Sequence, residues 1–224
     1  MKRLIRLLFS ATLLLTACTY DAYDKGEGNL SRVQADFGEA LVDADKQVYR
    51  VITDDGEALA VAAPFTQQWV QKADTVYRVL FYYKRAAAAD AGVEAVSCGK
   101  VSVAGIVPVD SVKGKMMTDP VRLESVWLSK NRRYLNVGFY LKSGTTSDEK
   151  AVHSLGIVAD TLLLHPDGKT TLCLRLYHDQ GGVPQYYSQR SYISIPMAGI
   201  KTDSVTFSAN TYDGEKTSRL QLAE

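Results

Sequence analysis

After Asn29 the chain alternates apolar and polar residues with a period of two, and turn-forming residues interrupt the pattern every few positions. A period of two is the repeat of a β-strand with one buried face, whereas an amphipathic helix repeats about every 3.6 residues. The same stretch contains no segment with convincing helical periodicity. This alternation therefore predicts an all-β chain of short strands joined by turns.

The first half of the chain has the pattern of a small barrel. Residues 46–53 and 57–63 flank an Asp-Asp-Gly turn at 54–56, which predicts a hairpin. Residues 75–85 then place four side chains on one face of a strand: Tyr77, Val79, Phe81 and Tyr83. With one or two further strands between 93 and 109, about five short strands suit an OB-like β-barrel, which we expect at 29–115.

The second half, residues 116–224, favours a β-sandwich. Gly and Pro punctuate the segment 112–120 and indicate a domain boundary there. A Pro-Asp-Gly turn at 166–168 predicts a hairpin whose second strand points Leu172, Leu174 and Leu176 inward. About seven strands over this length make an immunoglobulin-like sandwich the economical arrangement.

The first 18 residues have the layout of a lipoprotein signal peptide. A basic start precedes an apolar run from Leu7 to Leu15, and the segment Leu15–Cys18 resembles a lipobox. The apolar stretch 7–17 would reach about 16 Å as a helix, roughly half of a ~30 Å hydrocarbon core, so it does not predict a membrane span. The alternative is an ordinary cleaved leader with a chance cysteine.

Lipidation at Cys18, with palmitate among the acyl chains, would anchor the protein to a membrane through a tether at 19–28. Thr19 is not the aspartate that resembles an inner-membrane retention signal, so we expect the outer membrane, on either its periplasmic or its cell-surface face. In this oxidising compartment Cys98 and Cys173 could form a disulfide, but cysteines on separate predicted domains are more often unpaired.

Composition excludes one class of partner. The formal net charge is +1 and becomes −2 once the leader residues Lys2, Arg3 and Arg6 are removed. A chain without a basic excess is not suited to a polyanion, so we expect no nucleic acid among its partners.

The chain carries no recognisable catalytic motif. Gly168, Lys169 and Thr170 lie between two predicted strands and lack the preceding glycine of a phosphate loop. We therefore expect a protein that is not an enzyme and needs no cofactor or metal. The alternative is a metal-assisted hydrolase that uses His153 and His178 with the adjacent Asp179, although hydrogen-bonded histidines at strand ends are the favoured explanation of these residues.

Several side chains on exposed strand faces are candidates for contact with a ligand. Tyrosines at 134, 140, 186, 187 and 192 could form a stacking surface for a sugar or a peptide, but tyrosine is also a common strand residue. Our candidate ligand-facing set is Tyr134, Tyr140, Arg175, Tyr177, His153 and His178.

Four Asp-Ser/Thr-apolar triplets resemble acceptors for O-glycosylation of exported bacterial proteins. The same triplets could simply open strands, because an aspartate before a strand-forming residue is common there. The candidate acceptors are Thr75, Ser111, Thr161 and Ser204.

Taken with the lipobox, the segments 119–141, 150–158 and 172–182 resemble the NigD-like lipoproteins of Gram-negative gut bacteria. The residues that fit this pattern are Asp119, Pro120, Trp127, Tyr134, Leu135, Asn136, His153, Arg175 and His178. The resemblance implies an OB-like first domain, a sandwich-like second domain and a turn at 130–132. It implies little about activity beyond an immunity role against a bacteriocin.

These observations favour a membrane-anchored, non-enzymatic binding protein of the cell envelope. The sequence suggests a glycan, a peptide or another envelope protein as the ligand. Bacteriocin immunity and a hydrolase built on His153 and His178 are the alternatives.

Overall fold

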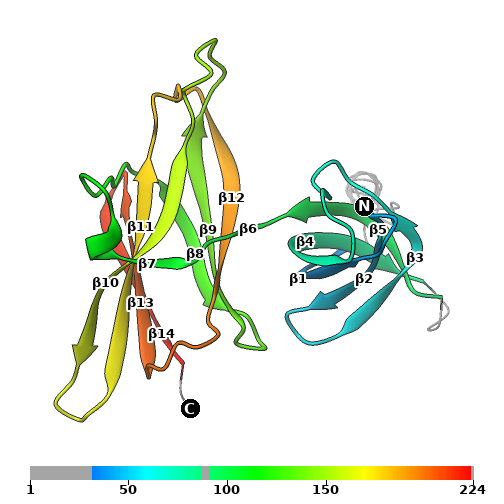
Figure 1. The fold of residues 1–224 in the computed structure, drawn as a ribbon, viewed down its shortest axis with the longest axis horizontal. Helices are drawn as coiled ribbons and strands as arrows, with labels where there is room; N and C mark the ends of the chain where they lie inside the picture. Colours follow the sequence, from blue (N-terminus) through cyan, green and yellow to red (C-terminus); the bar gives the residue numbers. More distant parts are fainter. Residues whose placement is uncertain (1–31, 87–90, 223–224) are drawn as a thin grey trace, which may run out of the picture. The chain divides into compact units, whose positions relative to one another are not determined.

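The computed structural model describes residues 32–86 and 91–222, and the leader, Cys18 and the tether therefore lie outside the described residues. Residues 34–224 form one compact unit. Its strands make a closed barrel and two further sheets, which confirms the predicted all-β fold (Figure 1). Within the described ranges no helix has the length and apolar character needed to cross a membrane.

The barrel consists of five strands in the order β1-β2-β3-β5-β4, and β4 pairs with β1 to close it. Val79, Phe81 and Tyr83 point into its core and are almost fully buried, as the alternation predicts. The turn at 54–56 joins β2 to β3, and this hairpin is also confirmed. The strands are β1 (Gln34–Val42), β2 (Val48–Thr53), β3 (Ala58–Phe65), β4 (Thr75–Arg85) and β5 (Val93–Lys100).

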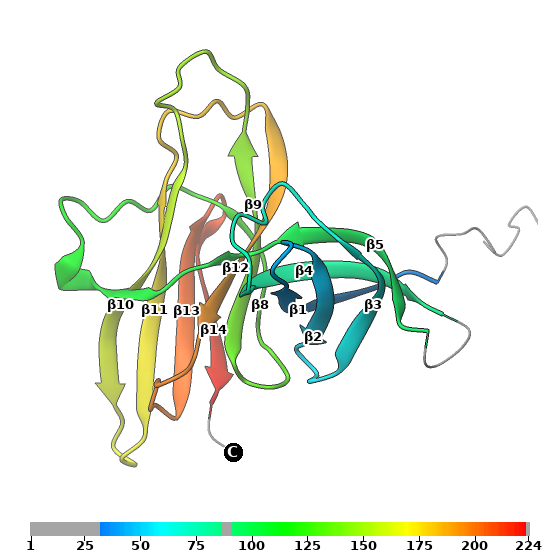
Figure 2. The same ribbon diagram turned by 45° about the vertical axis from the view of Figure 1, so that its right-hand side comes forward.

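The sandwich consists of a five-stranded sheet, β14-β13-β11-β10-β7, and a four-stranded sheet, β6-β12-β9-β8. Figure 2 shows β10, β11, β13 and β14 side by side in the larger sheet. The strands are β6 (Ser102–Val103), β7 (Ile106–Pro108), β8 (Arg122–Leu128), β9 (Tyr134–Ser143), β10 (Ser154–Leu164), β11 (Thr170–Asp179), β12 (Tyr187–Pro196), β13 (Ser204–Thr211) and β14 (Gly214–Gln221), with a single 3-10 turn, η2 (Val109–Ser111), described between β7 and β8.

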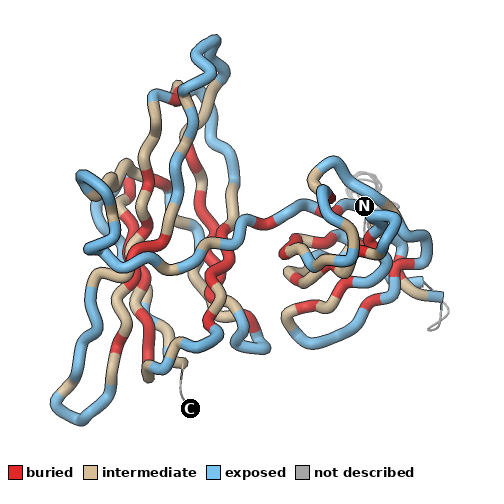
Figure 3. The backbone as a smooth tube through the Cα atoms, in the orientation of Figure 1, coloured by how far each residue is buried: buried red, intermediate tan, exposed pale blue. Residues whose placement is uncertain are grey.

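One apolar core fills the space between the two sheets. Phe139 of β9 and Phe207 of β13 are fully buried in it, and so are Leu174 and Leu176 of β11. In Figure 3 the buried residues follow the middle of these strands, whereas the hairpin tips are exposed. The predicted turn at 166–168 joins β10 to β11, and the turn at 130–132 joins β8 to β9, so both turns are confirmed.

The segment 93–109 differs from expectation in one respect. Only β5 belongs to the barrel, because β6 pairs with β12 and β7 pairs with β10 in the sandwich. The predicted boundary between residues 115 and 116 therefore lies beyond two short strands that belong to the sandwich sheets. Both pairings are parallel, as is the pairing of β11 with β13, whereas immunoglobulin-like sheets are antiparallel.

Candidate functional site

A cavity of about 280 Å³ opens in the sandwich where β8, β9 and β12 meet the β13–β14 hairpin. This volume is at the lower end of the range for small-molecule sites. We call it the sandwich cavity. Its charged and aromatic lining residues are Arg122, Tyr140, Lys142, Tyr212, Asp213 and Lys216.

The backbone around residue 121 holds the two sides of the sandwich cavity together. The amide of Val121 donates to the carbonyl of Asn210 at 3.0 Å, and the Asn210 side chain donates to the Thr118 carbonyl at 2.8 Å. The start of β8 is thereby fixed to the end of β13. These bonds preform one wall of the cavity, so ligand binding does not require a large rearrangement of that wall.

Strand register brings an arginine onto a tyrosine in the sandwich cavity. Arg122 of β8 lies opposite Tyr140 of β9, and its guanidinium carbon is 3.8 Å from the centroid of the tyrosine ring. On the other side of Tyr140, Arg190 of β12 forms an ion pair with Glu124 at 2.8 Å. Glu124 also accepts the Tyr140 hydroxyl at 3.3 Å. Glu124 therefore neutralises Arg190, whereas Arg122 keeps its charge exposed to the cavity.

The sandwich cavity carries an excess of positive charge. Within the described residues, neither Arg122 nor Lys142 has a carboxylate at ion-pair distance. Lys216 lies 3.7 Å from Asp213, and both side chains are largely exposed. Three cations and one carboxylate therefore line the cavity, and such an arrangement attracts an anion.

A second cavity, of about 290 Å³, lies on the barrel between β3 and β5. Its lining includes three alanines, Phe65, Val96 and Cys98, and its polar residues are Gln67, Ser97 and the one charged residue, Glu94. Burial raises the pKa of the Cys98 thiol to about 12, so this thiol is not a nucleophile at neutral pH. The barrel cavity therefore offers fewer convergent polar groups than the sandwich cavity.

His153 and His178 lie side by side, and their imidazole rings form a hydrogen bond to each other. Nδ1 of His153 is 3.1 Å from Nε2 of His178, and Nδ1 of His178 is 2.9 Å from the carbonyl oxygen of Asp119. A carbonyl only accepts, so Nδ1 of His178 carries the hydrogen and its Nε2 accepts from His153. Nε2 of His153 is then a bare nitrogen, and it is buried without a partner.

This histidine pair does not form a metal site with Asp179. The Asp179 carboxylate accepts the amide of Gly181 at 2.9 Å, and no group of three or more potential metal ligands occurs in the part of the chain that the structure describes. The bond between the imidazoles also occupies the lone pair of His178 that a metal would need. Burial, followed by the charge of His178, lowers the pKa of His153.

Three other predicted ligand-facing residues are engaged elsewhere or lie outside the sandwich cavity. The Tyr134 hydroxyl donates to Glu39 at 2.7 Å, and Arg175 forms an ion pair with Asp160 at 2.7 Å. Tyr177 lies half-buried on β11. Of the predicted set, the structure brings only Tyr140 to the sandwich cavity.

The remaining candidate tyrosines do not form one stacking surface. Tyr192 packs edge-on against Phe37, with ring centroids 5.1 Å apart. Tyr186 and Tyr187 are highly exposed, and neither lines the sandwich cavity.

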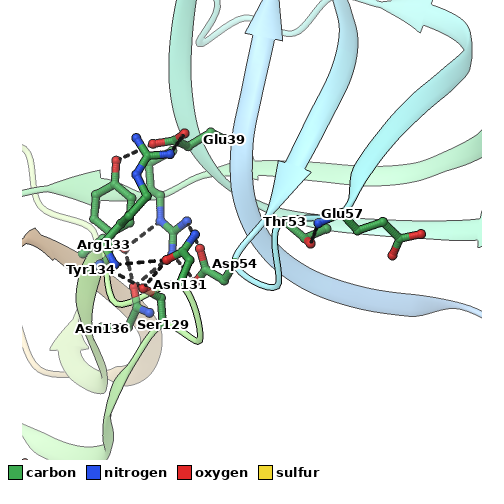
Figure 4. A network of polar contacts seen from close by, with 11 residues as sticks. Glu39, Thr53, Asp54, Glu57, Ser129, Asn131, Arg133, Tyr134 and Asn136 are labelled. Atoms are coloured by element: carbon green, nitrogen blue, oxygen red, sulfur yellow. Dashed lines mark hydrogen bonds and ion pairs between the residues drawn. The ribbon is translucent and has the colours of Figure 1, made fainter. Parts of the chain in front are cut away.

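Tyr134 belongs to a buried polar network around Arg78 of β4, part of which is shown in Figure 4. The Arg78 side chain is 1% exposed and donates twice to the Asp54 carboxylate, at 2.5 and 2.6 Å. It also donates to Asn136 and to Ser194, each at 3.1 Å. These bonds use barrel and sandwich residues together, so the network is a structural joint. We call it the Arg78 joint.

The predicted modification sites differ in exposure. Ser111 and Thr161 are exposed, Thr75 is half-buried, and Ser204 is buried and bonded to Thr171 at 2.7 Å. Modification at these positions stays a prediction. Cys98 and Cys173 are both free thiols in this structure.

Sequence reasoning missed most of the sandwich cavity. Three of its cations have the pattern of ordinary solvent-facing strand residues: Arg122, Lys142 and Lys216. Tyr212 and Asp213 have the pattern of a turn. The pairing of Arg122 with Tyr140 depends on a register shift between Leu123 and Ser125, which has no sequence signal. An arginine and a tyrosine on paired strands were the one available hint.

Comparison with known proteins identifies a family to which the sandwich is similar. Residues 105–222 match the family described as the NigD-like C-terminal beta sandwich domain. No curated protein matches the chain.

Several crystal structures share the fold across most of the chain. One is a NigD-like immunity protein from Bacteroides caccae, with 24% identity, a TM-score of 0.64, and coverage of 84% of this chain and 91% of that one. Another is a putative toxin-related protein from Parabacteroides distasonis, with 20% identity, a TM-score of 0.58, and coverage of 85% and 94%. A third, a putative lipoprotein from Bacteroides fragilis, has 14% identity, a TM-score of 0.58, and coverage of 84% and 98%.

Proposed function

This chain belongs to the NigD-like family, and from that premise we propose that it is a membrane-tethered, non-enzymatic binding protein of the cell envelope. The sandwich cavity carries the proposal, because Arg122 and Lys142 line it without a carboxylate partner among the described residues. An arginine left unpaired in a preformed cavity is available to a ligand, whereas a paired one is not.

Two observations support binding without catalysis. His153 and His178, the best sequence candidates for a reaction, are bonded to each other and to the Asp119 carbonyl, and the one ring nitrogen without a partner, Nε2 of His153, is buried. The lining of the sandwich cavity contains no cysteine or histidine, and its Ser188 makes no hydrogen bond to a base among the described residues.

The proposed tether is the lipid on Cys18, which would place the protein at the outer membrane. The lipobox pattern supports it, and the similar protein from Bacteroides fragilis is named a putative lipoprotein. A Cys18→Ala variant should leave the membrane fraction, whereas a Cys98→Ala variant should stay there. Unchanged fractionation of Cys18→Ala would contradict the tether.

A binding experiment tests the function itself. The purified chain is immobilised and exposed to envelope material from its own cells, both polysaccharide and protein. We expect binding that survives the double variant His153→Ala, His178→Ala and that is lost in the double variant Arg122→Gln, Lys142→Gln. Hydrolysis that disappears with the two histidines would instead favour an enzyme.

Immunity against a secreted toxin is the second candidate, because the similar Bacteroides caccae protein is named an immunity protein. In that case the ligand would be the toxin or its envelope target. Cells that lack this chain should then become sensitive to the toxin of their own strain. Equal survival with and without the chain would remove this candidate.

A further inference from the structure

The sandwich cavity combines a fixed cation with an aromatic wall. Arg122 lies on the Tyr140 ring, which holds the guanidinium plane in place while its N–H groups remain without a carboxylate. A guanidinium held in this way presents a planar fork that matches the two oxygens of a carboxylate. The strongest recognition element of the cavity is therefore one for a carboxylate.

Two lysines strengthen the preference for an anion. Lys142 lies on the same face of β9 as Tyr140, two residues further along, and Lys216 approaches from β14. Asp213 on the adjacent turn lies 3.7 Å from Lys216 and lowers the formal charge of the lining from +3 to +2. The charge of the cavity thus favours an anion, and the planar fork of Arg122 fits a carboxylate.

The other lining groups suit a hydroxylated ring. Tyr212 is 46% exposed on the β13–β14 turn and can present an aromatic face, while Ser188 and Asp213 can exchange hydrogen bonds with hydroxyl groups. A volume of about 280 Å³ is small for a site of this kind, so one ring fills it better than a folded partner does.

We propose that the sandwich cavity binds a carboxylate-bearing sugar, a uronic acid residue, with Arg122 on the carboxylate. This inference rests on the proposed binding function and names the ligand class for that site. The carboxylate receives the guanidinium of Arg122 and the charge of Lys142. The sugar hydroxyls face Asp213 and Ser188, and the apolar face of the ring packs on Tyr212.

Titration of the purified full-length chain with D-glucuronate tests the proposal, with chemical shifts followed by NMR at low salt. We expect saturable shifts of Arg122, Tyr140 and Tyr212. D-glucose has the ring without the charge and should bind at least about tenfold more weakly, since one good charged contact contributes about that factor or more. Acetate has the carboxylate without the ring and should also bind more weakly, because it cannot pack on Tyr212. Glucose 6-phosphate has a phosphate in place of the carboxylate, and tighter binding of this compound than of D-glucuronate would overturn the choice of a carboxylate.

Matched variants separate the cavity from the rest of the surface. Arg122→Gln should weaken D-glucuronate binding at least tenfold, whereas Lys169→Gln, which removes an exposed charge outside the cavity, should not change it. Tyr212→Ala should weaken binding several-fold, whereas Tyr186→Ala, which removes a more exposed tyrosine outside the cavity, should have no effect.

Equal binding of D-glucose and D-glucuronate would overturn the inference, and so would unchanged affinity in Arg122→Gln. If envelope material binds through Arg122 but D-glucuronate neither binds nor competes, the sugar class is wrong while the binding function stands. If a peptide carboxylate competes instead, the ligand is a peptide. If envelope material does not bind at all, the proposed function itself fails.

Discussion

Two arginines stack on tyrosines of the same strand, β9, but only one of them has its hydrogen bonds filled. Arg78 lies 4.2 Å from the ring centroid of Tyr134, and Arg122 lies 3.8 Å from that of Tyr140. The Arg78 guanidinium donates to Asp54, Asn136 and Ser194, whereas Arg122 has no carboxylate partner among the described residues. The same stacking pair therefore serves as a joint in one place and as an open site in the other.

This difference shows how to distinguish a charged side chain that stabilises the fold from one that is available to a ligand. A buried charge is stable only when its hydrogen bonds are satisfied, so the Arg78 joint must be complete within the chain. An exposed charge in a cavity retains water until a ligand replaces it, so Arg122 needs no partner from the chain. The hydrogen-bond partners, and not the residue type, distinguish the two roles.

The largest expected effect comes from breaking the Arg78 joint. Arg78→Met removes the partner of Asp54, whose side chain is only 14% exposed, and leaves its carboxylate without compensation. Loss of one member of a buried ion pair costs about 3–5 kcal/mol of unfolding free energy. Urea unfolding of the purified chain measures this loss.

The matched control for that variant is Arg85→Met. Arg85 also makes a two-pronged contact with a carboxylate, that of Glu57, but both side chains are about half exposed. Its loss should change stability far less, because water replaces the missing partner. Equal losses in the two variants would show that burial is not what makes the Arg78 joint important.

The histidine pair should have a smaller effect, and one that depends on pH. Burial lowers the pKa of His153 in the folded chain, whereas the unfolded chain has an ordinary value of about 6.5. The unfolded chain then binds more protons, so stability should fall as the pH drops through about 6.5 and continue to fall down to the lowered pKa.

His153→Asn tests this expectation, because its amide can still donate to His178 but does not titrate. The variant should lose part of the acid sensitivity seen in unfolding curves between pH 8 and pH 5. His165→Asn, which removes the histidine bonded to Thr171, should retain it. Identical pH profiles for the parent and His153→Asn would contradict the assignment.

The smallest effect on stability should come from Arg122. Arg122→Gln removes an exposed cation and one stacking contact, so the unfolding free energy should change by about 0.5 kcal/mol or less. Thermal unfolding measures it. A loss as large as that of Arg78→Met would contradict the distinction between the two arginines, because Arg122 would then be part of the framework.

The sequence alone predicted the strands and cores of the barrel and the sandwich, because the alternation of apolar and polar residues indicates which side chains are buried. Val79 and Phe81 of β4 and Leu174 of β11 lie in the cores as expected. Arg78 lies on the other face of β4, where alternation predicts exposure to solvent, yet it is buried by residues 58 and 116 positions later in the chain. Such long-range covering leaves no periodic signal.

The candidate site was predictable only in part for the same reason. Tyr140 was identified from its strand face, but its partner Arg122 depends on the shift of register in β8. The sandwich cavity also needs the β13–β14 hairpin, whose residues lie about 70 to 90 positions away. The local sequence does not show which charged side chains pair in the folded chain. It therefore could not predict that Arg190 has a carboxylate partner and that Arg122 has none among the described residues.

The short strands β6 and β7 have a consequence for solubility. Each lies at the end of its sheet and pairs with a short part of a longer strand, residues 193–194 of β12 or 157–159 of β10, that would otherwise be an edge there. Exposed edges invite pairing with other chains and aggregation. The segment that leaves the barrel therefore also protects these parts of the two edges, and a fragment that begins at residue 116 should self-associate more readily than the whole chain.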